Sequence, residues 1–228
     1  MSLNPAPRLS IRIDYRPDAL ARQWTRINEQ LADDMPRTAT GKVLHRVLRP
    51  GFVTLDRVHP WDAGLKDSHM IVVRLATLDD ADVIALQTSS VQQLHNEALP
   101  FIFKPPSADL LPAKKLAALI EDPNSIVAVA EISGKVVGHI YGAVVTRAEN
   151  EFHRADSYLY IYQIGIDDDA RRRGAGTALI TFMRDLARAL GLTALQLDHW
   201  AFNARARDFF EACGFLPMKI TMRQTLQG

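Results

Sequence analysis

From about residue 70 onward, apolar and polar positions follow the alternating rhythm of strands and helices. Six stretches alternate or are rich in Val and Ile, as strands are: 72–75, 126–132, 136–145, 158–166, 192–200 and 216–226. Four stretches place apolar residues at helical spacing: 79–95, 108–121, 175–190 and 203–212. This pattern predicts an α/β domain built on one mixed sheet.

Residues at the ends of these elements support the assignment. Thr77 is predicted to cap the first helix, with Asp80 three residues later in the place usually taken by Glu. Ser133-Gly134 separates two strand-like runs and indicates a hairpin. Gly191 is a fitting stop for the helix over 175–190.

The segment from Arg171 to Thr177 has the pattern of an anion cradle. It follows a strand and a short acidic turn, and it carries Gly174 and Gly176 one residue apart. Glycines let backbone N–H groups approach an anion closely. A helix predicted to begin near Ala175 adds its unpaired N–H groups and the positive end of its dipole. The segment therefore predicts phosphate binding.

The spacing excludes two common phosphate sites. A P-loop needs Lys followed by Ser or Thr directly after its second glycine, whereas Thr177-Ala178 follows Gly176 here. A dinucleotide fingerprint needs a third glycine at position 179, which is Leu179.

The segment resembles the acyl-CoA signature of the GNAT superfamily of N-acetyltransferases, Gln/Arg-x-x-Gly-x-Gly/Ala, with Arg171, Gly174 and Gly176 in its fixed positions. Residues 203–215 are similar to the family's downstream block, Asn-x-x-Ala-x-x-Phe-Tyr-Glu-x-x-Gly-Phe. The resemblance covers roughly residues 70–228. It implies a mixed central sheet flanked by helices, with residues 1–69 as an N-terminal extension.

The resemblance also implies the donor and the reaction. The donor is acetyl-CoA, an amine attacks its thioester directly in a ternary complex, and no metal is expected. The residues expected to bind CoA are Ile164, Gly165, Ile166, Arg171, Arg172, Gly174, Ala175, Gly176, Thr177 and Asn203.

The catalytic residues stay unassigned. The family often has a tyrosine that protonates the departing thiolate, but this chain has Phe210 at that position. The candidates for a base are Glu97, Asp198 and His199, and His95, Tyr162 and Gln163 are further ones. These gaps leave an alternative open, a CoA-binding or interaction module with little or no catalytic activity.

Composition bears on the protein's partners and on its location in the cell. Apolar residues make up 47% of the 228, charged residues 23%, and the net charge is +1, so bulk charge favours no nucleic acid partner. Apolar runs are too short to span a membrane, and no signal peptide is apparent. A single cysteine, Cys213, favours a reducing cytoplasm.

The acceptor is expected to be an amine on a small molecule or a protein, and a homodimer stays open. The acceptor side in the family includes the region of 99–103, which is apolar here and carries no carboxylate cluster. This composition disfavours an aminoglycoside.

The extension over 1–69 holds a second resemblance. Residues 36–49 are similar to the C-terminal motif of acyl-adenylating enzymes (acyl-CoA synthetases), whose lysine corresponds to Lys42. The chain has no room for their ATP-binding body, so Lys42 receives no catalytic role. The segment is a relic or a mis-set start before Met70, a part that docks on the transferase, or a target for acylation at Lys42; the first explanation is favoured.

Overall fold

The computed structural model describes residues 10–14, 70–107, 113–122 and 124–226, the first of these ranges as backbone only. Two compact units make up the chain: Met1–Leu197 contains the sheet, and Asp198–Gly228 contains the last helix. The motif around Lys42 lies outside the described residues.

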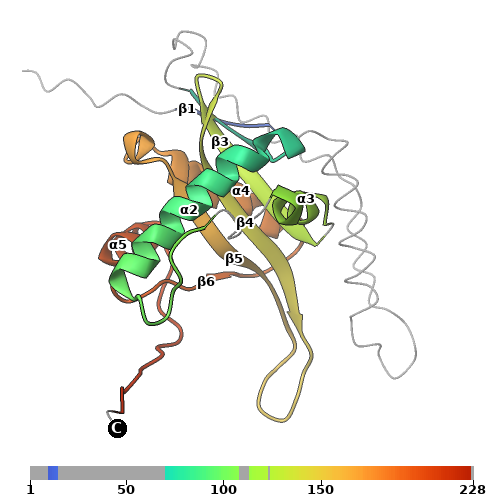
Figure 1. The fold of residues 1–228 in the computed structure, drawn as a ribbon. Coiled ribbons are helices and arrows are strands. Elements are labelled where there is room, and N and C mark those ends of the chain that lie inside the picture. The colour runs from blue at the N-terminus through green and yellow to red at the C-terminus, as the bar shows by residue number, and fades with distance from the viewer. Residues whose placement is uncertain (1–9, 15–69, 108–112, 123, 227–228) are drawn as a thin grey trace, which may run out of the picture. The chain divides into compact units, whose positions relative to one another are not determined.

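The described part of the first unit contains a sheet of six strands: β1 Ser10–Asp14, β2 Met70–Leu75, β3 Ser125–Ile132, β4 Lys135–Arg147, β5 Asp156–Ile166 and β6 Leu195–Leu197. The strands lie side by side in chain order (Figure 1). β1 runs parallel to β2 and β6 parallel to β5, whereas β2 to β5 pair in antiparallel fashion. The predicted mixed sheet is confirmed.

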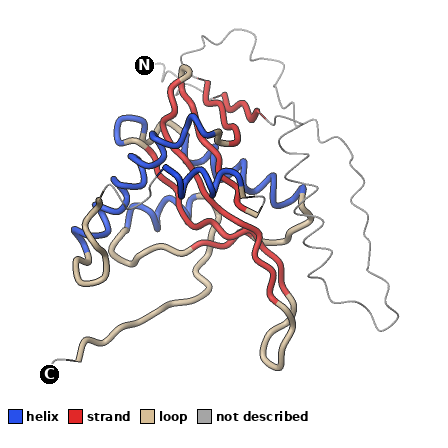
Figure 2. The backbone as a smooth tube through the Cα atoms, turned by 45° about the vertical axis from the view of Figure 1, so that its right-hand side comes forward, coloured by secondary structure: helices blue, strands red, loops and turns tan. Residues whose placement is uncertain are grey.

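Helices cover both faces of this sheet. α2 (Ala81–Ala98) and α3 (Ala113–Glu121) lie on one face, and α4 (Ala175–Ala189) lies on the other (Figures 1 and 2). The alternation along β4 agrees: His139 contacts α2, whereas Gly142, three residues on, faces Met183 of α4.

The interior between the sheet and α4 is built as the helical pattern predicts. The expected stripe on α4 is at most 5% exposed: Leu179, Met183, Leu186 and Leu190. Burying each such side chain contributes about 1.5–3 kcal/mol. The helix stops at Gly191, whose φ of 71° suits glycine, and Leu192 N–H donates to the Ala187 carbonyl at 2.9 Å.

The local turn signals are also found. Ser133 and Gly134 both have positive φ, 53° and 75°, as the tight turn between β3 and β4 requires. The carboxylate of Asp80 accepts the Thr77 N–H at 2.7 Å and its hydroxyl at 3.1 Å. A short 3₁₀ helix, η3 (Leu78–Asp80), precedes α2.

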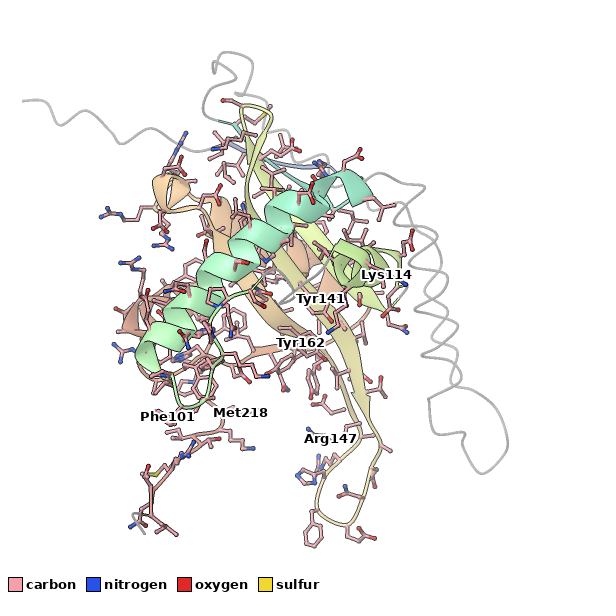
Figure 3. The ribbon with its side chains drawn as sticks, viewed as in Figure 1. Phe101, Lys114, Tyr141, Arg147, Tyr162 and Met218 are labelled. Atoms are coloured by element: carbon pink, nitrogen blue, oxygen red, sulfur yellow. The ribbon has the colours of Figure 1, made fainter. Side chains whose placement is uncertain are left out.

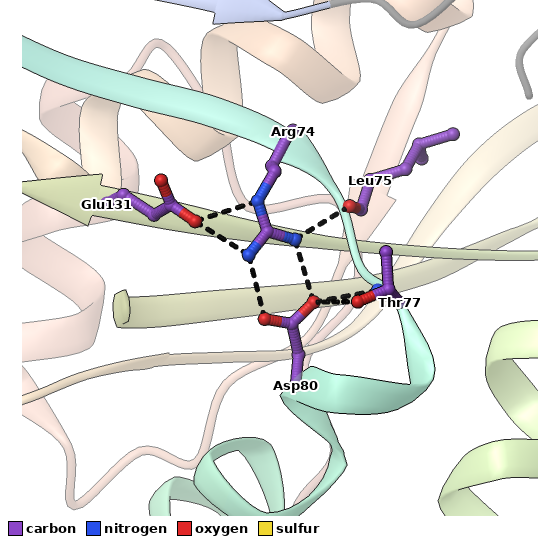
Figure 4. Close-up of polar contacts among 5 residues, drawn as sticks. All are labelled: Arg74, Leu75, Thr77, Asp80 and Glu131. Carbon is purple, nitrogen blue, oxygen red and sulfur yellow. Dashed lines mark hydrogen bonds and ion pairs between the residues drawn. The ribbon is translucent and has the colours of Figure 1, made fainter. Parts of the chain in front are cut away.

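Arg74 ties this helix start to the sheet (Figure 4). Its guanidinium donates to both oxygens of Asp80 at 2.7 and 2.8 Å, and its Nε donates to Glu131 Oε1 at 2.7 Å. Burial raises the pKa of Asp80, but the hydrogen bonds from Arg74 and Thr77 outweigh it, so that pKa lies below its usual value. Asp80 is only 5% exposed, so it depends on this partner.

A second buried polar contact joins α2 to β4 and to the end of β5. Gln87 Nε2 donates to Asp167 Oδ1 at 2.9 Å, and Gln87 Oε1 lies 2.8 Å from His139 Nδ1. Because the amide oxygen of Gln87 only accepts, His139 Nδ1 carries the proton. His139 is 1% exposed, and burial lowers its pKa to about 4.

Two sequence predictions differ from the structure at the C-terminal side. The strand expected over 192–200 is only Leu195–Leu197, and the strand predicted over 216–226 is wrong. In that last stretch Leu216, Met218, Ile220 and Met222 are 80–91% exposed. Alternation gives a segment two faces, but a strand also needs a hydrogen-bonding neighbour, and within its own unit this segment has none.

At the other end of the chain, part of the extension joins the sheet. β1 pairs with β2 from Ser10↔Met70 to Asp14↔Arg74, although sequence patterning places the start of the domain near residue 70. Separately, no helix among the described residues is both long and apolar enough to cross a membrane.

Replacing Arg74 tests its role at the helix start. Arg74→Met leaves Asp80 and Glu131 close together without a cation, so the free energy of unfolding is expected to fall by about 3 kcal/mol in urea titrations at pH 7. Arg188→Met is the matched control, because Arg188 pairs with Asp185 at the surface at 3.2 Å and is worth less than about 1 kcal/mol. A loss for Arg74→Met as small as that of the control would contradict this role.

The buried histidine predicts how stability depends on pH. Unfolded histidine has a pKa of about 6.5, and that of His139 is about 4, so the unfolded chain binds the proton between these values. Stability from this group is therefore complete above pH 6.5 and is lost as the pH falls, by about 2 kcal/mol between pH 7 and pH 5.

His139→Asn keeps a donor toward Gln87 and removes the titration, so its unfolding free energy is expected to change less between these two pH values. The exposed His153 supplies the control, since His153→Asn retains the wild-type difference. If His139→Asn loses as much stability at pH 5 as wild type, the assignment of this titration is wrong.

Candidate functional site

One edge of β5 is left unpaired beyond β6. β6 pairs only with Leu159, Tyr160 and Ile161, whereas β5 continues to Ile166. Within the described first unit, the stretch 162–166 has no strand on that side. Its edge therefore offers backbone N–H and C=O groups to a ligand with polar groups of its own.

A bulge between β4 and β5 lies just past the last residue of β5 that pairs with β6. Tyr141 of β4 lies opposite Gln163, and Gly142 lies opposite Ile161, so Tyr162 is the extra residue. Bulges redirect side chains and often lie next to active sites. Tyr162 is thus both the bulged residue and the first one past the last pairing with β6.

The loop after β5 leads directly into the N-terminus of α4. After a 3₁₀ turn at Asp168–Ala170, Arg172 and Gly174 adopt positive φ, 58° and 91°. Gly174 is the N-cap, and the first internal hydrogen bond runs from Ala178 N–H to its carbonyl at 2.9 Å. The N–H groups of 175–177 precede that bond and lie at the positive end of the helix. The helix start predicted near Ala175 is confirmed.

The charges of this loop favour an anion. Arg171, Arg172 and Arg173 are exposed. Arg171 forms an ion pair with Asp168, and the Lys135 ammonium lies 4.0 Å from Asp169. These pairs occupy two of the acidic residues before the loop, while Arg172 and Arg173 directly precede Gly174, the N-cap of α4. The arrangement suits a pyrophosphate.

The structure explains why position 165 is occupied by glycine, which the sequence alone did not show. A Cβ on Gly165 would lie 2.8 Å from His139 Cε1 and 3.2 Å from its Nδ1. The ring of His139 therefore occupies the space that a side chain would need. The sequence interpretation attributed this glycine to close approach by the ligand; hydrogen bonding of CoA to the backbone of 164–166 stays a prediction.

Tyrosine rings gather on the sheet face that carries α2 and α3. Tyr141 and Tyr162 stack with centroids 5.2 Å apart, and Tyr160 lies 4.9 Å from Tyr162. Tyr141 packs against the core under α2 and α3, whereas Tyr162 is 53% exposed (Figure 3). An exposed ring stacked on a partly buried one offers an aromatic surface beside the bulge.

The hydroxyl of Tyr141 belongs to a chain of hydrogen bonds. Burial raises its pKa, with smaller effects from a hydrogen bond with Ser125, which lowers it, and from the charges of Tyr162 and Asp122, which raise it. Ser125 is 3% exposed, and its Oγ donates to Asp122 Oδ2 at 3.1 Å. The sequence did not predict these hydrogen bonds, because they depend on the pairing of β3 with β4. It predicted only the turn after Asp122.

The candidate bases on α2 have different surroundings. Glu97 is exposed and accepts from Gln93 Nε2 at 2.6 Å. His95 stacks on Phe103 with centroids 4.8 Å apart, and burial lowers its pKa. The apolar loop after α2 is held by Asn96 Nδ2, which donates to the Phe103 carbonyl at 2.7 Å. Its Phe101 is 65% exposed.

The remaining candidates belong to the second unit, whose helix is α5 (Ala204–Ala212). Asp198 and His199 are exposed, and His199 Nδ1 lies 3.3 Å from the Trp200 carbonyl. The predicted cap is confirmed, because Asn203 Oδ1 accepts the Ala206 N–H at 3.0 Å. Phe210 is 7% exposed and has neighbouring rings in Phe209 and Phe215, so it supplies packing in this unit.

Among the described residues, no group of three or more His, Cys, Asp or Glu side chains lies close enough together to hold a metal ion.

Solved structures share this fold. The BH1408 protein from Bacillus halodurans, as a tetramutant, superposes with a TM-score of 0.65 at 23% identity over 68% of this chain and 99% of that one. A chain described as a possible acetyltransferase from Clostridium difficile 630 gives a TM-score of 0.54 at 20% identity over 69% of this chain and 97% of the other. At these identities the likeness concerns the fold alone.

Two curated relatives match parts of the sequence. The mycothiol acetyltransferase of Beutenbergia cavernae is 40% identical over 60 residues, which are 26% of this chain and 20% of that protein. The protein named "Probable N-acetyltransferase camello" of Xenopus tropicalis is 29% identical over 134 residues, 59% of this chain and 55% of that protein. The chain thus spans about a fifth and about half of the relatives that it matches.

A family match covers the region that holds both the cradle and the downstream block. Residues 88–215, more than half of the chain, match the acetyltransferase (GNAT) family. This chain belongs to the GNAT acetyltransferase family.

Proposed function

We propose that this protein transfers an acetyl group from acetyl-CoA to a primary amine. One observation carries the proposal: the unpaired edge of β5 runs directly into a helix N-terminus that is open to an anion. An extended arm with amide groups followed by a pyrophosphate is the outline of CoA. The unpaired edge of β5 suits the arm with its amide groups, and the N-terminus of α4 suits the pyrophosphate.

In this proposal the donor lies along the first unit as follows. The pyrophosphate binds the loop and helix start through Arg171, Arg172, Gly174, Ala175, Gly176 and Thr177. The pantetheine arm bonds the backbone of Ile164, Gly165 and Ile166. Asn203 caps α5 in the second unit, and in the family the matching residue also contacts pantetheine.

The chemistry needs little more than positioning. The bulge at Tyr162 brings the thioester to the point where β5 leaves β6, and a backbone N–H there would polarise its carbonyl. The amine attacks directly, and the C–S bond breaks without a covalent enzyme intermediate. A thiol with a pKa of about 8.5 leaves as the thiolate without an acid, so Phe210 does not prevent the reaction.

The acceptor is an amine on a small molecule or a protein. One relative is named mycothiol acetyltransferase and the other "Probable N-acetyltransferase camello"; both names fit acetyl transfer, and the second fits an amine acceptor. The exposed aromatic surface at Tyr162 and the apolar loop with Phe101 favour an acceptor with an apolar part next to its amine.

A second candidate is a CoA-binding module with little or no activity. Phe210 favours it, because a buried phenyl ring stands where the family often has a tyrosine hydroxyl. The cradle is intact in both cases, so CoA binding does not separate the two functions, whereas turnover does.

The cradle is tested by placing a negative charge in it. Gly176→Asp adds a carboxylate to the first turn of α4, where an acid stabilises the helix but repels a phosphate. The dissociation constant for CoA, measured by calorimetry, is expected to rise at least about tenfold, or about 1.4 kcal/mol. Gly176→Ser is the uncharged control: it adds a side chain without a charge, and its loss of affinity is expected to be smaller than that of the aspartate variant. If the aspartate variant binds CoA as tightly as the serine variant, the pyrophosphate lies elsewhere.

An acceptor screen separates the enzyme from the module. Full-length protein is incubated with acetyl-CoA and a panel of primary amines comprising benzylamine, putrescine and a peptide with a free N-terminus, and thiol release is followed. Turnover with at least one of these amines is expected. Calorimetric binding of CoA without turnover on any of them would support the module instead.

A further inference from the structure

The loop that carries the predicted anion cradle begins at Asp167, directly after β5. The N–H of Asp167 donates to the Val137 carbonyl at 2.9 Å, and its carbonyl accepts the Ala170 N–H at 3.0 Å. Its side chain reaches α2, where Oδ1 accepts from Gln87 Nε2 at 2.9 Å. The start of the loop is thus tied to the end of the sheet by its backbone and to a helix by its carboxylate.

The next two acidic residues of the loop have weaker attachments. Asp168 forms an ion pair within the loop, Asp169 lies 4.0 Å from the Lys135 ammonium, and the two carboxylates are 84% and 77% exposed. Exposed pairs of this kind hold a loop weakly. Gln87 is only 5% exposed, so a polar partner is costly to lose there. The bond from Gln87 therefore makes Asp167 the firm attachment among the three aspartates.

The orientation of the Gln87 amide is set by its two partners. A carboxylate only accepts, so the amide nitrogen faces Asp167. The amide oxygen then faces His139 Nδ1 at 2.8 Å, and that ring nitrogen carries the proton. A flipped amide would place two acceptors together at one end and two donors together at the other. The side chain is therefore locked in the one arrangement that holds Asp167.

The loop held in this way contains a residue in a strained conformation. Arg172 has a φ of 58° although it is not glycine, and Gly174, the N-cap of α4, has a φ of 91°. A non-glycine residue keeps such a conformation only where its surroundings impose it. The attachment of Asp167 stands at one end of this stretch and α4 at the other. Without the first, Arg172 is free to relax, and the cradle has to be rebuilt each time an anion binds.

We propose that Gln87 is a positioning residue for the donor: it holds Asp167, and through it the cradle, in the shape that binds a pyrophosphate. The inference rests on the function proposed above, in which that pyrophosphate is part of acetyl-CoA. Gln87 acts through Asp167 and not on the reacting atoms. It supplies order that is present before the donor arrives, so it contributes to affinity and not to the chemical step.

Two variants remove and restore the bond. Gln87→Met keeps the length of the side chain but has no amide. The dissociation constant for CoA is then expected to rise about tenfold, because the ligand itself must impose one strained backbone conformation. Gln87→Glu combined with Asp167→Asn exchanges the roles of the two residues at unchanged net charge. The amide at 167 now donates to the carboxylate at 87, whose other oxygen still accepts from His139, and most of the affinity is expected to return.

Two controls separate positioning from a general loss of stability. Gln93→Met makes the same substitution on the exposed side of α2, where it removes the bond to Glu97, and is expected to bind CoA as wild type does. Leu116→Ala leaves a cavity beside α3, since Leu116 is 2% exposed. It is expected to lower stability at least as much as Gln87→Met and to leave CoA affinity unchanged. Urea unfolding measures the stability of each variant, and calorimetry measures its affinity for CoA.

Kinetics with whichever amine of the panel is acetylated supply a second readout. Gln87→Met is expected to raise KM for acetyl-CoA in parallel with the dissociation constant, while kcat at saturating donor stays close to wild type. A group that acted on the reacting atoms would lower kcat instead, and that result would contradict a positioning role.

The outcomes separate this inference from the proposed function. If CoA does not bind, or Gly176→Asp weakens binding no more than Gly176→Ser does, the proposed donor site fails and this inference fails with it. If the cradle variants behave as expected while folded Gln87→Met binds CoA as tightly as wild type, this inference alone is wrong. Weak binding that the double variant does not restore also contradicts it, because the bond to Asp167 is then not the cause. An equal loss of affinity in Leu116→Ala would mean that affinity follows overall stability.

Discussion

The contacts of one amide, that of Gln87, hold together the parts of the first unit on which the site depends. Its oxygen faces His139 on β4 and its nitrogen binds Asp167 at the end of β5, 80 residues away in the chain. A buried amide with partners on both sides fixes the positions of all three elements, because losing either bond leaves a desolvated polar group. α2 is thereby set against the sheet, and the loop toward α4 begins from a fixed residue.

In the proposed function, donor and acceptor take different sides of the same strand. The edge of β5 past Ile161 and the N-terminus of α4 offer backbone groups to an extended anion. The face of the same strand carries Tyr162 over Tyr141, where an amine can arrive. The bulge at Tyr162 joins the edge to the face, and in the proposed reaction the amine attacks the thioester there.

Sequence reasoning succeeded where the signal is local. The start of α4 at Ala175, the cap at Asn203 and the turn at Ser133 depend on neighbours in the chain, and all appear as predicted. It failed at 216–226, because a strand requires a partner that alternation cannot supply. It also missed the Gln87 contacts and the link from Tyr141 to Asp122. Both arise from strand register and helix packing, which bring distant residues together. The same packing places the His139 ring where a side chain on Gly165 would lie.

The central claim is that the loop before α4 and the free edge of β5 together hold the donor. Amide ¹H–¹⁵N spectra of the full chain, recorded while CoA is added, test it most directly. The account predicts that the largest shift changes fall on the amides of 172–177 and of 164–166, which belong to the cradle and the unpaired edge. Saturable binding of CoA with the largest changes elsewhere, and none in these two stretches, would contradict it.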